Sequence, residues 1–114
     1  MLEQQLLQLL EKEQLYLEPK LSLADLATRL DAPKNRVSKI INATQQRSFY
    51  DLVNGYRVEH LKQQLNNPEN AQFTILALAL NSGFNSKASL NRIFKNITGL
   101  TPRQYLDQRA QATH

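Results

Sequence analysis

The 114-residue chain contains no cysteine, which excludes a disulfide framework, a thiol nucleophile and a cysteine-based zinc site. Glycine and proline are scarce, at three and four residues, and the apolar fraction of 41% is typical of a folded chain. No stretch approaches the roughly 18 consecutive apolar residues of a membrane span, and no signal-peptide pattern is present. The composition predicts one soluble, helix-rich domain of the cytoplasm.

Acidic residues are missing from two stretches of the chain, residues 32–50 and 70–106, and each stretch holds four lysines and arginines. Residues 1–31 contain six acids and three bases, a local balance of −3, although the whole chain carries a formal charge of +4. The positive charge therefore lies in two separate blocks. These blocks are candidates for contact with a polyanion, and the N-terminal part should face away from it.

The residue pattern in the first half of the chain predicts two helices, a tight turn and a third helix. Apolar residues from Leu2 onward predict an amphipathic helix that ends before Glu18-Pro19. Ser22, with Asp25 as its capping-box partner, begins a short helix that stops at Asp31-Ala32-Pro33. A further helix covers about Lys34 to Thr44, with its inner face at Val37, Ile40, Ile41 and Thr44.

The second half predicts the same order after a long connecting helix. Ser48 and Asp51 begin that helix, and proline ends it after Asn66. Thr74 caps the next short helix, and a turn at Gly83 leads to a helix from about Ser86, whose inner face is Leu90, Ile93, Phe94 and Ile97 and which ends at Gly99. Thr101-Pro102 begins a last helix, which should fray after Gln108.

The predicted fold is all-α, with about seven helices in a single domain over residues 1–114. Residues 1–47 form the N-terminal helix and a first helix-turn-helix, residues 48–67 the linker helix, and residues 74–108 a second helix-turn-helix with the last helix. The halves match Ser22 with Thr74, Val37 with Leu90, Lys39 with Arg92 and Ser48 with Thr101, allowing one extra residue in the second turn. Two copies of one supersecondary unit are therefore predicted.

The second helix of each pair presents an outward face without a carboxylate. A helix that enters the major groove needs such a face, because phosphate repels an acid. An isolated polar stripe is usually only a solvated surface, but here the stripe occurs twice in equivalent places, which favours recognition of double-stranded DNA. Since Arg can pair with guanine and Asn with adenine, Arg92 and Asn91 are predicted to read bases, and Lys39 and Ser38 hold the equivalent places.

The linker helix also agrees with DNA binding. From about Ser48 to Asn66 it would be roughly 28 Å long, against about 34 Å for one turn of B-DNA. Two reading helices connected in this way are predicted to enter successive major grooves.

The chain from about Leu15 to Tyr105 resembles the DNA-binding domain of AraC/XylS-type transcription regulators. The strongest likeness runs from Ala79 through Gly83-Phe84-Asn85-Ser86-Lys87-Ala88-Ser89-Leu90-Asn91-Arg92-Ile93-Phe94-Lys95 to Thr98-Gly99-Leu100-Thr101-Pro102-Arg103-Gln104-Tyr105. The first half departs from the family at Asp31, where a turn glycine is usual, and at Ile41, where an aromatic residue is common. Asp tolerates left-handed backbone geometry, so the turn is expected to form.

The resemblance implies which residues contact DNA. Base contacts are implied for Asn35, Ser38, Lys39, Lys87, Ala88, Asn91 and Arg92. Phosphate contacts are predicted for Lys34, Arg36, Asn42, Arg47, Ser89, Lys95 and Arg103. Arg57 matches a family arginine that fixes the linker and is expected to be structural.

The resemblance further implies promoter DNA and RNA polymerase as partners and a separate sensor domain, which this sequence lacks. The chain is either a stand-alone regulator or a fragment of a longer one, which could be membrane-anchored. No catalytic residue, cofactor or metal is expected, so the chain is not predicted to be an enzyme; His60 is expected on a helix surface. The alternative function is a basic helical module that binds an acidic protein partner.

Overall fold

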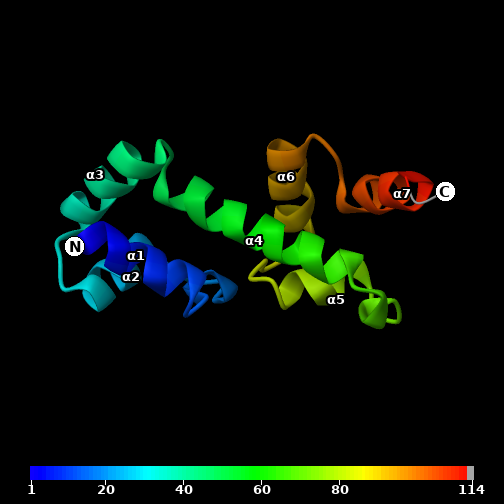
Figure 1. Ribbon diagram of the computed structural model, residues 1–114, viewed down its shortest axis with the longest axis horizontal. Coiled ribbons are helices and arrows are strands. Elements are labelled where there is room, and N and C mark those ends of the chain that lie inside the picture. Colours follow the sequence, from blue (N-terminus) through cyan, green and yellow to red (C-terminus); the bar gives the residue numbers. More distant parts are fainter. Residues whose placement is uncertain (113–114) are drawn as a thin grey trace. The chain divides into compact units, whose positions relative to one another are not determined.

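The computed structural model of the protein describes the backbone of residues 1–112 and the side chains of residues 1–109. Within that range the chain forms α-helices and short 3₁₀ turns without a strand, so the predicted all-α class is confirmed (Figure 1). The elements are α1 (Leu2–Glu11), η1 (Leu15–Leu17), α2 (Leu23–Leu30), α3 (Lys34–Gln45), α4 (Phe49–Asn66), η2 (Pro68–Asn70), α5 (Ile75–Leu80), α6 (Lys87–Thr98) and α7 (Pro102–Ala112).

The chain divides into two compact units, residues 1–56 and 57–114, and α4 contributes residues to both. The first unit contains the helix pair α2 and α3. Ser22 and Asp25 form a reciprocal capping box at the start of α2, with both hydrogen bonds at 3.1 Å. Asp31 ends α2 in the left-handed conformation, at φ 52°. The predicted capping box and turn are confirmed.

Buried apolar residues from every helix of the first unit form one core. Leu6 and Leu10 of α1 pack with Leu26 of α2, Val37 and Ile41 of α3 and the first two turns of α4. Because Val37 and Ile41 lie one turn apart, they fix which side of α3 faces inward. The opposite side of α3 is thereby directed to solvent.

The first helix is shorter than the sequence predicted. α1 ends at Glu11, and Gln14 adopts a left-handed conformation at φ 53° before the single turn of η1. Residues 11–14 are all polar, so a continued helix would bring no apolar side chain to the core. The break instead lets Tyr16 turn inward, where it is 6% exposed.

The second unit repeats this arrangement with α5 and α6. Thr74 caps α5 by accepting a hydrogen bond from the Ala77 amide at 3.0 Å, and Ser86 caps α6 through the Ser89 amide at 3.1 Å. Gly99 ends α6 at φ 80°, a conformation that glycine adopts without steric cost. These predicted helix boundaries are confirmed.

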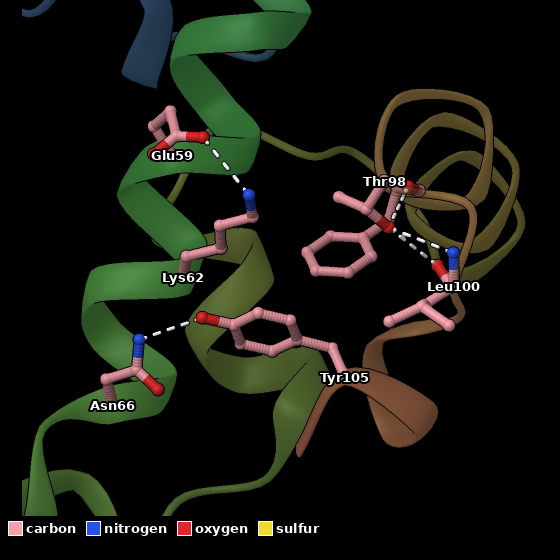
Figure 2. A network of polar contacts seen from close by, with 7 residues as sticks. Glu59, Lys62, Asn66, Thr98, Leu100 and Tyr105 are labelled. Atoms are coloured by element: carbon pink, nitrogen blue, oxygen red, sulfur yellow. Dashed lines mark hydrogen bonds and ion pairs between the residues drawn. The ribbon is translucent and has the colours of Figure 1, made fainter. Parts of the chain in front are cut away.

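Tyr105 of α7 joins the elements of the second unit (Figure 2). Its hydroxyl accepts a hydrogen bond from Asn66 of α4 at 2.9 Å, and its ring lies edge-on to Phe94 of α6 at 5.7 Å between centroids. Lys62 of α4 lies over the same ring, 5.9 Å from its centroid. The outward direction of α6 is therefore fixed by α4 and α7 together.

Three further predictions are wrong, one for the end of α7 and two for buried positions on α3 and α6. The predicted fraying after Gln108 is wrong for residues 109–112, which continue α7, and the Arg109 side chain donates to Asn66 at 3.0 Å; residues 113–114 lie outside the described range. Thr44 and Ile97 occupy equivalent places at the ends of α3 and α6, and both are exposed, Ile97 by 47%. α2 and α5 have only eight and six residues, too few to cover the last turn of a twelve-residue partner.

Candidate nucleic-acid interface

The outward face of α6 carries most of the residues that the sequence singled out in the second unit. Leu90 and Phe94 are buried, which turns the other side of the helix to solvent. Ser89 is half-buried, and its amide and hydroxyl both form hydrogen bonds with the Ser86 hydroxyl at the helix start. The exposed residues of this face are Lys87, Ala88, Asn91, Arg92 and Lys95.

The outward face of α3 is organised in the same way. Val37 and Ile41 are buried, and Ser38 beside them is half-buried. The exposed residues are Lys34, Asn35, Arg36, Lys39 and Asn42. Each unit thus gathers its predicted residues on one face of its second helix.

Neither face carries a carboxylate, and two ion pairs among the described residues lie on other elements. Arg29 pairs with Glu13 at 3.1 Å, and Lys62 pairs with Glu59 at 3.2 Å. The lysines and arginines of α3 and α6 are in neither pair. Both faces therefore present cations and short polar groups to solvent, which suits them to a polyanion.

A surface hollow lies in the second unit where α5, α6 and the start of α7 meet. It is lined by Leu76 of α5, by Lys87, Leu90 and Asn91 of α6, and by Pro102 and Arg103 of α7. Its lining combines apolar side chains with two cations and an amide. Arg103 therefore lines the same hollow as Lys87 and Asn91, although it lies twelve positions after Asn91 in the sequence.

Arg47 lies at a different place from the other predicted residues. A Cβ atom on Gly55 of α4 would lie 3.0 Å from the Arg47 guanidinium, so the arginine rests across the one position of α4 that lacks a side chain. The phosphate contact of Arg47 stays a prediction.

Tyr56 follows Gly55 on α4. Its hydroxyl donates to Glu11 at 2.8 Å and its ring stacks on Tyr16 at 5.5 Å. Burial and the Glu11 carboxylate raise the pKa of the Tyr56 hydroxyl, and the nearby positive charge of Arg47 opposes this. The cluster stabilises the contact of α1 with α4 inside the first unit.

His60 and Arg57 differ from the surface residues around them. Arg57 is 8% exposed, in keeping with its expected structural role. His60 was expected on the helix surface, which is wrong: it is half-buried, and its Nδ1 lies 2.7 Å from Oγ of Ser82. No sequence signal indicated this contact, because the two residues lie 22 positions apart.

The Ser82 hydroxyl settles which atom of His60 carries the proton. It donates to the Leu78 carbonyl oxygen at 2.9 Å, so it accepts from His60 and Nδ1 is the protonated nitrogen. Burial lowers the pKa of His60. The surroundings of His60 therefore favour the neutral imidazole over the charged form.

Comparison with known proteins finds one matching family and several relatives. The family described as "Helix-turn-helix domain" matches residues 26–108. The chain is 33% identical over 100 residues to uncharacterized HTH-type transcriptional regulators of Staphylococcus aureus, strains COL and N315. The alignment covers 88% of this chain but 13% of those relatives, so the chain spans a small part of their length.

Solved structures share the fold. The C-terminal domain of AraT, a response regulator from Geobacillus stearothermophilus, matches with a TM-score of 0.83 and 21% identity, over 94% of this chain and 84% of that one. A DNA-binding transcriptional dual regulator from Escherichia coli K-12 matches with a TM-score of 0.77 and 20% identity, over 96% and 93%. At these identities the likeness concerns the fold.

Proposed function

Since the chain belongs to the AraC-type helix-turn-helix family, we propose that it binds double-stranded promoter DNA and regulates transcription, reading bases with α3 and α6. One observation carries the proposal: both units direct a carboxylate-free face of their second helix to solvent while burying the other face in their own core. Phosphate attracts such a face, and the major groove admits a helix.

The contacts proposed for each unit follow from these faces. Bases are read by Asn35, Ser38 and Lys39 of α3 and by Lys87, Ala88, Asn91 and Arg92 of α6. Phosphates are bound by Lys34, Arg36, Asn42, Arg47, Ser89, Lys95 and Arg103. Most of these side chains are exposed to solvent, which supports the proposed roles. Because Arg103 and Lys87 line one hollow, we propose that a phosphate binds beside the start of α6.

We also propose that the two reading helices enter successive major grooves. The proposal rests on α4, which contributes residues to both units and whose 18 residues give a length of about 27 Å. The length of α4 is therefore comparable to one turn of B-DNA, which is about 34 Å.

Further partners belong to the proposal on the strength of the family alone. The proposed partners are RNA polymerase and a sensor domain. The protein itself is proposed to be a regulator without enzymatic activity that acts in the cytoplasm. In the described part of the chain, no helix is long and apolar enough to cross a membrane.

A salt titration tests DNA binding against the alternative of an acidic protein partner. Affinity for a duplex should fall linearly on a log-log scale with salt, with a slope of about −0.9 for each phosphate contacted. A polyglutamate chain serves as a control polyanion without base pairs. Failure to bind any duplex at low salt, or equal affinity for polyglutamate, would exclude the proposed function and favour the alternative.

A further inference from the structure

Tyr50 is a large aromatic residue that the first unit leaves 64% exposed. It is the second residue of α4, and its ring meets Phe49 edge-on at 5.2 Å between centroids. Phe49 itself is buried in the core beside Val37 and Ile41 of α3. Packing in the core explains why Phe49 is an aromatic residue, but it does not explain why a phenol is exposed at Tyr50.

The internal repeat gives Tyr50 a counterpart in the second unit. Ser48 caps α4 by accepting a hydrogen bond from the Asp51 amide at 3.2 Å, and Thr101 caps α7 through the Gln104 amide at 3.1 Å. α4 follows α3 as α7 follows α6, so the two caps are equivalent. The second residue of α4, Tyr50, therefore corresponds to the second residue of α7, Arg103.

The second unit shows what lies beside this position. Arg103 lines the same hollow as Lys87 and Asn91, which belong to the outward face of α6. The residue two places after the cap is thus next to the face proposed to meet DNA. The repeat implies that the equivalent place in the first unit is beside Lys34 and Ser38 of α3, which correspond to Lys87 and Asn91.

We propose that Tyr50 contacts the duplex backbone beside α3, its hydroxyl donating to a phosphate oxygen as the first unit's counterpart of Arg103. The inference rests on the proposed DNA binding. A phenol is neutral and can donate one hydrogen bond, whereas arginine brings a positive charge. The contact of Tyr50 should therefore add affinity without releasing a counterion, and it should not depend on base sequence.

Three variants of the full chain test this role by equilibrium binding to a specific and a random duplex over a range of salt concentrations. Tyr50→Phe keeps the ring and removes the hydroxyl, and we expect roughly two- to tenfold weaker binding to both duplexes, with the salt slope unchanged. Tyr50→Arg should steepen the log-log slope by about 0.9, because it adds one phosphate contact that releases counterions. Phe73→Ala is the control: this aromatic is 51% exposed, but it precedes the cap of α5 and does not line the hollow beside α6, so binding should not change.

The possible results separate this inference from the proposed function. A wild-type chain that binds no duplex removes the proposed function itself. A wild-type chain that binds while Tyr50→Phe binds equally well overturns the hydrogen bond of Tyr50 alone. Weaker binding by Tyr50→Phe together with an unchanged slope for Tyr50→Arg places Tyr50 away from phosphate and overturns the assignment as well.

Discussion

The side-chain amide of Asn66 donates a hydrogen bond to the Tyr105 hydroxyl at 2.9 Å, and its carbonyl oxygen accepts one from Arg109 at 3.0 Å. Asn66 is the last residue of α4, whereas Tyr105 and Arg109 lie one turn apart on α7. One side chain therefore ties the end of α4 to two turns of α7. Through the ring contact of Tyr105 with Phe94, the same tie supports α6.

Tyr105→Phe should lower the free energy of unfolding by about 0.5–1.5 kcal/mol, because it removes one hydrogen bond and leaves the ring in place. Asn66→Ala should cost at least as much, since it also removes the partner of Arg109. Urea unfolding followed by circular dichroism measures both. Wild-type stability of Tyr105→Phe would show that this bond contributes nothing.

The His60–Ser82 pair predicts a pH dependence of stability. Burial lowers the pKa of His60 in the folded state, so the unfolded chain binds a proton more readily. Stability should therefore be full above about pH 6.5, the ordinary histidine pKa, and should fall as the pH drops from there toward the lower folded pKa. His60→Gln should lose this part of the pH dependence in unfolding measured between pH 7.5 and 5.5. An identical pH profile for the variant would contradict the burial argument.

Asp31 and Gly99 both end a helix in the left-handed backbone conformation, and we expect opposite effects on stability when each is substituted. A Cβ atom on Gly99 would meet nothing within 4 Å, so Gly99→Ala changes only the backbone cost at φ 80°, about 1–2 kcal/mol of lost stability. Asp31→Gly should leave stability unchanged or raise it by up to about 1 kcal/mol, because glycine adopts φ 52° freely. Thermal unfolding of both variants checks the pair. A clear loss of stability in Asp31→Gly would mean that the Asp31 side chain itself stabilises the turn.

The sequence predicted the parts of the fold that depend on local chemistry. Ser22, Thr74 and Thr101 are caps whose partners lie three residues away, so the pattern alone locates them. The inner faces of α3 and α6 likewise follow from helical spacing at Val37 and Leu90.

Features that depend on distant elements could not be predicted. The helical spacing of Ile97 indicates a face, but the length of α5 decides whether anything covers it. His60 meets Ser82 only after α4 and α5 have packed together. The nearness of Arg103 to Asn91 depends in the same way on how α7 leaves α6.

Two exposed residues of α6, Asn91 and Arg92, should determine which DNA sequence the protein prefers. Arg92→Ala and Asn91→Ala should each cost about 1–3 kcal/mol on the preferred duplex, with little change on random DNA. Arg103→Ala should instead weaken both duplexes similarly and reduce the salt slope. Competition binding with the two duplexes measures the difference. If Arg92→Ala lost the same affinity for both duplexes, Arg92 would not be a residue that reads bases.

The two units should contribute unequally to sequence preference. The first unit departs from the family at Asp31 and Ile41, and a lysine makes a less directional contact with guanine than an arginine does. Lys39→Ala should therefore change sequence preference less than Arg92→Ala. The reverse order would show that the first unit is the stronger reader.

Selection of binding sites from random duplexes by the wild-type chain, Lys39→Ala and Arg92→Ala tests the central claim most directly. The account predicts an enriched site with two parts about 10 base pairs apart, one for each second helix. Lys39→Ala should relax positions in one part and Arg92→Ala positions in the other. Enrichment of no sequence, or relaxation of the same positions by both variants, would contradict the claim that α3 and α6 read DNA.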